Sequence, residues 1–239
     1  MKKILVAAII LAVFLVSGYF YGFKNLFIPS VIKKVRGSRI EELKQKAEDA
    51  EAMFKEDITS AANGERAGYA YEKLGIGYAR NKDWTPAITS LEKAIEYGRS
   101  GARVHYFLGV AYANRAKDLD SGDDVKSAEA HYRRALEINP KLADAAYGMA
   151  ILTYYLKKDR EAGISMAKSI IQTDPKYYQA HFALARFYYE KDDPATALAV
   201  YERLYDDLNR EKETPRIREL RKNCQDNITR LMVELSGNK

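Results

Sequence analysis

The sequence YEKLGIGY at Tyr71–Tyr78 returns as HYFLGVAY at His105–Tyr112 and as HFALARFY at His181–Tyr188. Each copy begins with a large ring, carries Leu and then Gly or Ala at its fourth and fifth positions, and ends on Tyr. Small residues let the two helices of a hairpin approach closely, and large neighbours fill the surrounding space. A single hairpin cannot bury its apolar face, but stacked hairpins share a continuous core. The pattern therefore predicts a stack of helical hairpins.

The stretches resemble the first helix of a tetratricopeptide repeat, which reads W-x2-L-G-x2-Y. The second halves follow the same family pattern at Ala87, Leu91 and Ala94, at Ala128, Tyr132, Ala135 and Pro140, and at Ala197, Tyr201 and Leu204. The third repeat is the most divergent and offers Ala146, Met149, Ala150, Ala162 and Pro175. The resemblance implies an all-α, right-handed α-solenoid of about four hairpins over 68–211, divided into 68–101, 102–142, 143–177 and 178–211.

Two further helices are expected at the ends of the solenoid. Thr214 and Pro215 are suited to the start of a helix, and an apolar stripe follows, which predicts a capping helix over 214–236. A second stripe begins at Ile40 and predicts a helix over 40–64 that packs on repeat one or forms a stalk. Repeat two also carries an insertion, 117–127, whose acidic residues lack the spacing of a calcium loop and predict a solvated turn.

The first 39 residues differ from the rest of the chain. After a short tail, 1–3, the run 4–23 has no charged residue and as a helix is long enough to span the hydrocarbon core of a membrane. The segment 24–39 is basic and is expected to link this transmembrane helix to the solenoid. The alternative is a signal sequence cleaved after Gly18, which would release a soluble binding protein. We expect an uncleaved anchor and a repeat domain outside the cytoplasm, which is the periplasm if the protein is bacterial.

The formal net charge of +6 comes from this N-terminal region. Residues 1–39 contain seven bases and no acid, which leaves 32 bases against 33 acids from Ile40 onward. A nucleic-acid-binding protein carries its positive charge on the folded part. The composition therefore argues against a nucleic-acid partner and for contact with the lipid bilayer.

The sequence offers no catalytic constellation. His105 and His181 occupy the same place in two repeats, which indicates a role in core packing, and His131 lacks a partner at metal-ligand spacing. Cys224 lies on the apolar stripe of the last helix, where burial makes a thiol a poor nucleophile. We expect no enzymatic activity, no cofactor and no metal.

The family resemblance implies a concave groove, lined by the first helices, that binds another protein or a peptide segment. Mapped on this sequence, the groove residues are Tyr69, Arg80, Arg103, Tyr106, Asn114, Tyr147, Tyr154, Tyr155, Phe182, Arg186 and Tyr189. Tyrosine offers rigid apolar area and one polar tip, which suits such a site. The expected function is that of a membrane-tethered scaffold or adaptor. The alternative is a structural component that self-assembles through its end helices into a homo-oligomer or a larger envelope complex.

Overall fold

The computed structural model describes residues 28–237, with side chains from Arg36 onward, and every regular element in that range is an α-helix. The helices are α2 (Ile28–Glu56), α3 (Ala61–Asn81), α4 (Trp84–Glu96), α5 (Ala102–Leu119), α6 (Gly122–Ile138), α7 (Ala143–Tyr155), α8 (Arg160–Thr173), α9 (Tyr178–Glu190), α10 (Pro194–Asn209) and α11 (Pro215–Gly237).

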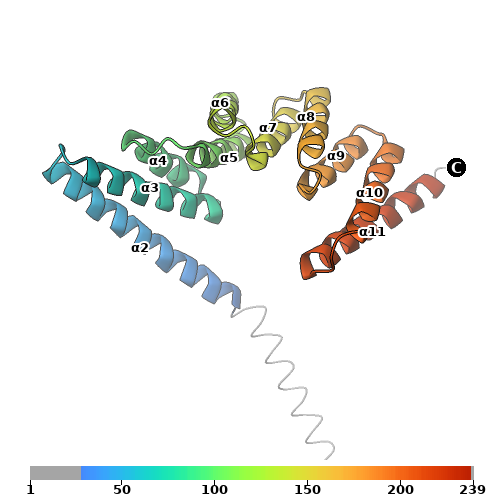
Figure 1. Cartoon of the computed structure of the whole chain (residues 1–239), viewed down its shortest axis with the longest axis horizontal. Helices are drawn as coiled ribbons and strands as arrows, with labels where there is room; N and C mark the ends of the chain where they lie inside the picture. The colour runs from blue at the N-terminus through green and yellow to red at the C-terminus, as the bar shows by residue number, and fades with distance from the viewer. Residues whose placement is uncertain (1–27, 238–239) are drawn as a thin grey trace, which may run out of the picture.

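The helices form an arch of stacked hairpins (Figure 1). The helices pair as four hairpins: α3 with α4, α5 with α6, α7 with α8, and α9 with α10. The first helices of successive hairpins also touch one another, so α3, α5, α7 and α9 form one continuous layer. This layer is the inner surface of the arch, and the predicted all-α repeat solenoid is confirmed.

Close approach within a hairpin depends on glycine at two of the signature positions. A Cβ atom added to Gly75 would lie 2.5 Å from Cγ of Leu91, and one added to Gly109 would lie 2.6 Å from the Tyr132 ring. Leu91 is fully buried and Tyr132 nearly so. Each large side chain of the second helix therefore occupies the space that glycine leaves on the first helix.

The four hairpin turns share one backbone conformation. Lys82, Asp120, Lys158 and Asp192 follow the first helix of each repeat and adopt positive φ angles between 52° and 67°. This left-handed conformation ends a helix by turning its last backbone groups toward the next segment. The chain then enters the second helix at once, which keeps the paired helices antiparallel.

The N-terminal region differs from the sequence expectation. The predicted helix over 40–64 is interrupted, because α2 ends at Glu56 and α3 begins at Ala61. Between them, the Asp57 carboxylate accepts hydrogen bonds from the backbone and hydroxyl of Thr59, and Ser60 caps α3. These local bonds satisfy backbone groups outside a helix and so favour a turn. In the opposite direction, α2 extends back to Ile28 and takes up much of the predicted linker 24–39.

A polar cluster fastens α2 to the first hairpin. The Glu51 carboxylate accepts hydrogen bonds from the hydroxyls of Tyr71 and Tyr97 and from the Lys93 ammonium, whose Nζ lies 3.0 Å away. These donors lower the pKa of Glu51 to about 2, with the Tyr71 hydroxyl as the largest cause. Apolar contacts of Ile40 and Ala47 with the same hairpin complete the junction. The helix α2 is therefore part of the folded solenoid, which favours the packed form over a free stalk.

The insertion 117–127 is not the loop that the sequence suggests. It lengthens both helices of the second hairpin, and only Asp120 and Ser121 lie between α5 and α6. Asp124 is buried and its carboxylate pairs with the Arg115 guanidinium at 2.7 Å. This ion pair explains why an acidic residue of the insertion lies inside a helix rather than in a solvated turn.

At the other end, α11 covers the last hairpin. Ile217, Cys224, Ile228 and Leu231 are buried against α10, whereas the opposite face of α11 is mainly polar. The Thr214 hydroxyl caps this helix by accepting a hydrogen bond from the Ile217 backbone at 3.1 Å. A helix with one apolar stripe and one polar face closes a repeat stack in the manner expected of a terminal cap.

The predicted membrane-spanning segment 4–23 lies outside the described residues. Across residues 28–237, none of the helices combines the length and apolar character that crossing a membrane requires.

Candidate binding groove

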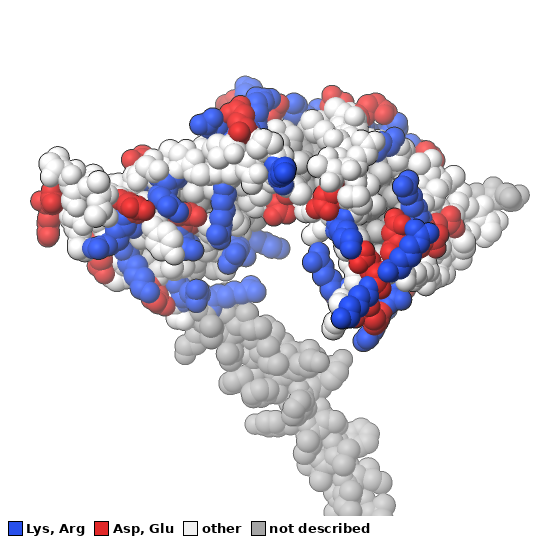
Figure 2. Space-filling view, viewed as in Figure 1, with Lys and Arg blue, Asp and Glu red and all other residues white. Residues whose placement is uncertain are grey.

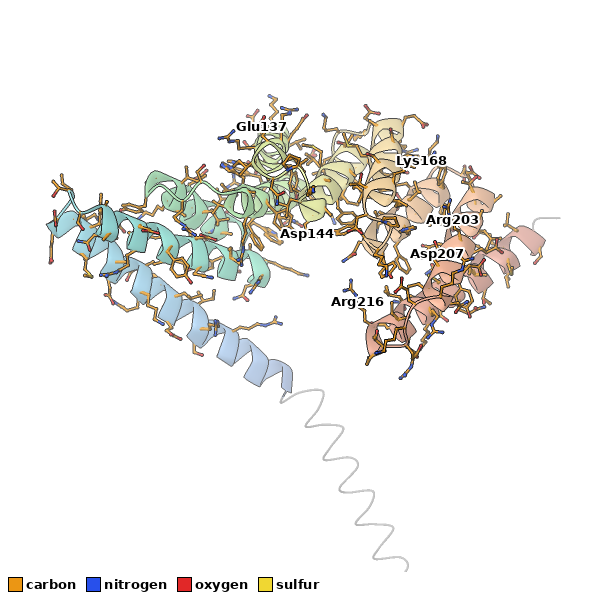
Figure 3. All side chains as sticks on the ribbon, in the orientation of Figure 1. Glu137, Asp144, Lys168, Arg203, Asp207 and Arg216 are labelled. Atoms are coloured by element: carbon orange, nitrogen blue, oxygen red, sulfur yellow. The ribbon has the colours of Figure 1, made fainter. Side chains whose placement is uncertain are left out.

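A groove runs along the inner surface of the arch and is centred on α7. It encloses a cavity of about 630 Å³ between α5 and α9. Its lining consists of Tyr106, Val110, Ala113, Asn114, Lys117, Tyr132, Asp144, Tyr147, Gly148, Ile151, Leu152, Tyr155, Leu156, Arg186 and Glu190. Figure 3 shows Asp144 on this concave side and Glu137 on the opposite side of the arch.

The floor of the groove depends on a second-helix residue. The Tyr132 ring comes from α6 and passes between Gly109 of α5 and Gly148 of α7. A Cβ atom at either glycine would lie 2.6 Å from this ring. Burial raises the pKa of Tyr132 far above its ordinary value, so its phenol stays neutral. The two glycines therefore admit an aromatic floor beneath the half-buried Tyr106 ring, whose centroid lies 6.4 Å from that of Tyr132.

Asp144, Arg186 and Glu190, three of the four charged residues that line the groove, already have partners within the protein. The Tyr155 hydroxyl donates to Glu190 at 2.9 Å, and the Arg186 guanidinium lies over the Tyr155 ring at 5.0 Å. On the other side, the Asp144 carboxylate accepts a hydrogen bond of 2.7 Å from the Tyr177 hydroxyl. Burial is the main cause that raises the pKa of Tyr155, and the bond to Glu190 adds to it. The resulting surface presents neutral aromatic faces more than free charges.

Five of the residues predicted for the groove come together in it: Tyr106, Asn114, Tyr147, Tyr155 and Arg186. They project from α5, α7 and α9, the first helices of the second, third and fourth hairpins. The Tyr147 and Tyr106 rings are half-buried, and burial raises the pKa of both phenols. Each ring is therefore partly packed on the solenoid and partly open to the groove.

Tyr154 does not line the groove, and this prediction is corrected. Its side chain is only 3% exposed, its ring stacks on Phe187 at 3.9 Å, and its hydroxyl donates to the Phe187 carbonyl. The partner residue lies in the next repeat, so Tyr154 joins α7 to α9. The ring faces the core because Phe187 offers both a stacking surface and a buried acceptor.

Phe182 and Tyr189 also lie outside the groove. The Phe182 ring packs edge-on against Tyr201 of α10, at 5.8 Å between centroids. The Tyr189 hydroxyl donates to Glu234 of α11, and the Arg230 guanidinium covers its ring. Because α11 covers this end of the inner surface, the open groove stops at α9.

The remaining predicted residues lie toward the N-terminal end of the inner surface. Tyr69 is 51% exposed and stands between the cations of Lys73 and Arg99, away from the groove. Arg80 and Arg103 line a second cavity with side chains of α2. The open groove therefore occupies about half of the surface predicted to bind a partner.

Several lining residues were not selected from the sequence: Lys117, Tyr132, Gly148, Leu152 and Leu156. Tyr132 was predicted as a core residue of the second helix, and its size alone does not show that it reaches the inner surface. Gly148 is the feature of the sequence that could have indicated this position of Tyr132, because a small residue on a groove-facing helix allows the close approach of another side chain.

The histidines make structural contacts rather than a ligand site. Nδ1 of His105 lies 3.0 Å from Nδ1 of His131, and Ser100 bonds the other nitrogen of His105. Burial lowers the pKa of His131 to about 4, with a smaller effect from His105. His181 bonds the Pro175 carbonyl. Cys224 is buried, which raises the pKa of its thiol to about 12.

The stacked hairpins and the groove along their first helices define a helical-repeat binding protein. A model of the tetratricopeptide repeat family matches residues 72–143 and 150–211, which together make up more than half of the chain. The chain belongs to the tetratricopeptide repeat family. Proteins with this fold are generally binding scaffolds without enzymatic activity. No curated protein matches the chain in sequence.

Solved structures of other tetratricopeptide repeat proteins show the same fold. YrrB, described as having an unusual peptide-binding site, is 20% identical, with a TM-score of 0.52 over 71% of this chain and 79% of its own. TTC0263 of Thermus thermophilus is 15% identical, with a TM-score of 0.51 over 82% and 95%. PilF of Pseudomonas aeruginosa is 21% identical, with a TM-score of 0.50 over 70% and 78%. At these identities the likeness concerns the fold alone.

Proposed function

We propose that this protein is a membrane-tethered scaffold that holds an extended segment of another protein in its concave groove. The observation that carries the proposal is the tyrosine-lined cavity between α5, α7 and α9. Three half-buried rings, Tyr106, Tyr147 and Tyr155, converge there from two neighbouring first helices. Exposed aromatic faces beside an apolar floor are typical of the central part of a protein-binding site.

The chemistry of the groove favours a segment with apolar or aromatic side chains at its centre. Asp144 and Glu190 are already bonded to tyrosine hydroxyls, so a charged partner would have to compete with existing bonds. Val110 and Ile151 add aliphatic surface between the rings. That a protein of the same fold, YrrB, is described as having a peptide-binding site supports this assignment.

Site-specific photo-crosslinking tests the groove. A benzophenone amino acid at Lys117, which lines the groove and is exposed, should give a crosslinked partner in native membranes. The same group at Lys126, exposed on the second helix of that repeat, should not. Crosslinking from Lys126 alone would place the partner on the convex side and refute the proposal.

The proposed tether is the segment 4–23. As a helix, this uncharged run is about as long as the hydrocarbon core of a membrane is thick. The native protein should stay in the membrane fraction after an alkaline or high-salt wash. A soluble protein whose first residue is Tyr19 would refute the tether and support a released binding protein.

The repeat domain is proposed to lie outside the cytoplasm, and cysteine labelling tests this. Asp118 is exposed at the end of α5, so Asp118→Cys should react with an impermeant maleimide in intact cells or spheroplasts. Cys224 serves as an internal control, because it is buried and its pKa is raised to about 12. Labelling that requires lysis would reverse the orientation.

A further inference from the structure

A second cavity, of about 370 Å³, lies at the N-terminal end of the inner surface. Five cationic side chains line it: Arg36, Arg39, Lys73, Arg80 and Arg103. They come from α2, α3 and α5, which are far apart in sequence, and the fold brings them together. Figure 2 shows Lys and Arg side chains gathered along the inner side of the arm that α2 and α3 form.

No acidic side chain of the described region lines this cavity. Arg36, Arg80 and Arg103 are exposed, and within residues 36–237 none of the five cations forms an ion pair within 4.0 Å. Lys73 and Arg103 instead lie over the rings of Tyr69 and Phe107. About half of the other basic residues in the described region form an ion pair, whereas none of these five does, so unpaired positive charge is concentrated at this cavity.

The floor of the cavity is apolar, which narrows the class of ligand. Ile40 and Leu43 of α2 meet Ile76 and Gly77 of α3 there. A Cβ atom on Gly77 would lie only 3.0 Å from the Ile40 side chain. Glycine therefore allows α2 to lie close to α3, which places the arginines of α2 at the cavity. A cationic rim above an aliphatic floor matches a ligand with a phosphate group and a short apolar part.

The position of the cavity in the chain indicates the source of that ligand. Arg36 is 13 residues beyond Phe23, the last residue of the uncharged run, and because α2 begins at Ile28 the two residues are at most about 30 Å apart. The residues between them include Lys24, Lys33 and Lys34 and no acid. Basic segments next to a membrane span are attracted to anionic headgroups within a Debye length of the surface.

We propose that this cavity, here termed the basic cavity, binds the phosphate headgroup of an anionic lipid and so orients the solenoid on the membrane. The inference rests on the proposed tether, which holds the cavity within reach of the bilayer. It is separate from the groove, since none of its five cations lines the tyrosine cavity. Arg103 and Tyr106 lie on the same helix, so lipid contact would fix the groove relative to the membrane.

Hydrogen–deuterium exchange of the full chain in vesicles tests the proposal. We expect residues 76–81 and 101–107 to be protected in phosphatidylcholine vesicles that contain phosphatidylglycerol, and not in phosphatidylcholine alone. Raising the salt concentration should remove the protection, because exposed charges are screened. Arg80→Glu with Arg103→Glu should abolish it. Lys168→Glu with Arg203→Glu is the matched control on α8 and α10, with the same change in charge, and should retain it.

Each alternative result overturns the proposal in a defined way. Equal protection in both vesicles would show that the cavity does not select anionic lipid. Protection by inorganic phosphate in neutral vesicles, without an added effect of phosphatidylglycerol, would make it a site for a soluble phosphate. Loss of protection in both charge-reversed variants would show that the protection depends on the net charge of the protein and not on this cavity. Alkaline extraction of the same vesicles tests the tether separately. Failure of the tether can therefore be told apart from failure of the cavity to bind lipid.

Discussion

At the scale of single residues, small and large side chains are matched across the helices. Tyr132 reaches the groove floor only because residues 109 and 148 carry no Cβ atom. The Tyr154 ring, by contrast, turns into the core and stacks on Phe187. Two tyrosines of neighbouring repeats therefore have opposite roles: one forms the base of the binding surface, and the other holds adjacent first helices together.

The fit around Tyr132 leads to a stability prediction. Gly148→Ala should destabilise the fold by about 1–3 kcal/mol, because the new methyl group displaces a buried ring that has little room to move. The matched control is Gly122→Ala at the exposed start of α6, where a Cβ atom meets nothing within 4 Å. This change should shift stability by less than about 0.5 kcal/mol. Urea unfolding followed by circular dichroism measures both, and equal effects would contradict the account.

The histidine pair predicts a dependence on pH. His131 has a pKa of about 4 in the folded chain, below the ordinary 6.5, so the unfolded chain binds its proton more tightly. The stability contributed by the neutral ring is therefore present above pH 6.5 and is lost as the pH falls toward 4. Between about pH 7 and pH 5 the loss should be about 1 kcal/mol, after allowance for partial exposure.

His131→Phe keeps an aromatic ring next to Tyr112 but removes the titrating group. The urea midpoint of this variant should change less between about pH 7 and pH 5 than that of the unaltered chain. The readout is the change in urea midpoint between the two pH values, compared between the variant and the unaltered chain. The midpoint at one pH is not sufficient, because loss of the bond to His105 lowers stability at both pH values. Parallel slopes would show that His131 does not titrate in this range.

At the scale of the helices, the end elements limit the open groove. The helix α11 takes Tyr189 into contact with Glu234 and closes one end, and α2 closes the first hairpin at the other. In solenoids each unit is stabilised mainly by its neighbours, so the end units depend on such caps. The junction of α2 relies on one carboxylate, Glu51, which accepts from three side chains of the first hairpin, Tyr71, Lys93 and Tyr97.

Removal of that carboxylate should loosen α2 selectively. Glu51→Ala leaves the hydroxyls of Tyr71 and Tyr97 without their carboxylate acceptor, at a cost of about 1–3 kcal/mol. Hydrogen exchange should accelerate in residues 40–56 and stay unchanged in α9. Since the pKa of Glu51 is lowered from 4.5 to about 2, the contribution of this carboxylate is present above pH 4.5 and falls below it.

A uniform increase of exchange across the chain in Glu51→Ala would instead mean that α2 and the solenoid unfold as one unit. Glu42→Ala provides the control on the same helix. Its carboxylate is exposed and pairs with Lys46 on the same helix, so its removal should leave exchange in α2 nearly unchanged.

The repeat pattern could be predicted from the sequence because its signature residues are local. Gly75, Gly109 and their large neighbours recur at fixed helical spacing, and each hairpin follows from one such set. The inner surface was harder to predict. Whether Tyr154 faces solvent or core depends on Phe187, 33 residues further along the chain, and whether Tyr189 is open depends on α11. The break at Asp57 is also set by local side-chain bonds that an apolar stripe does not reveal.

At the scale of the whole molecule, charge and apolar surface are separated. The basic cavity lies near the start of α2, and the neutral tyrosine groove lies in the centre of the arch. The space-filling view shows the arch hollowed between its two arms, with Lys and Arg side chains on both arms (Figure 2). The proposed arrangement places a lipid contact at one end of the inner surface and a protein contact at its centre.

An alternative use of the molecule is assembly through its ends. Met232 and Val233 are 49% and 66% exposed on α11 and could meet another copy. They are two isolated apolar residues on a mainly polar face, and single exposed apolar side chains are ordinary on protein surfaces. The groove offers a larger aromatic surface. If the groove binds the partner, substitutions in the groove should abolish binding and those on α11 should not, and assembly through the ends predicts the reverse.

The most direct test of the groove is capture of the partner from detergent extracts by a chain that carries Tyr106→Ala with Tyr155→Ala. Loss of one such aromatic anchor commonly costs about 1–2 kcal/mol of binding, or about tenfold or more in affinity. Capture should therefore be abolished while the helical circular-dichroism signal persists, and Lys168→Glu with Arg203→Glu should leave capture intact. Unchanged capture by the tyrosine variant, together with its loss in Met232→Glu with Val233→Glu, would contradict the account and establish end-to-end assembly instead.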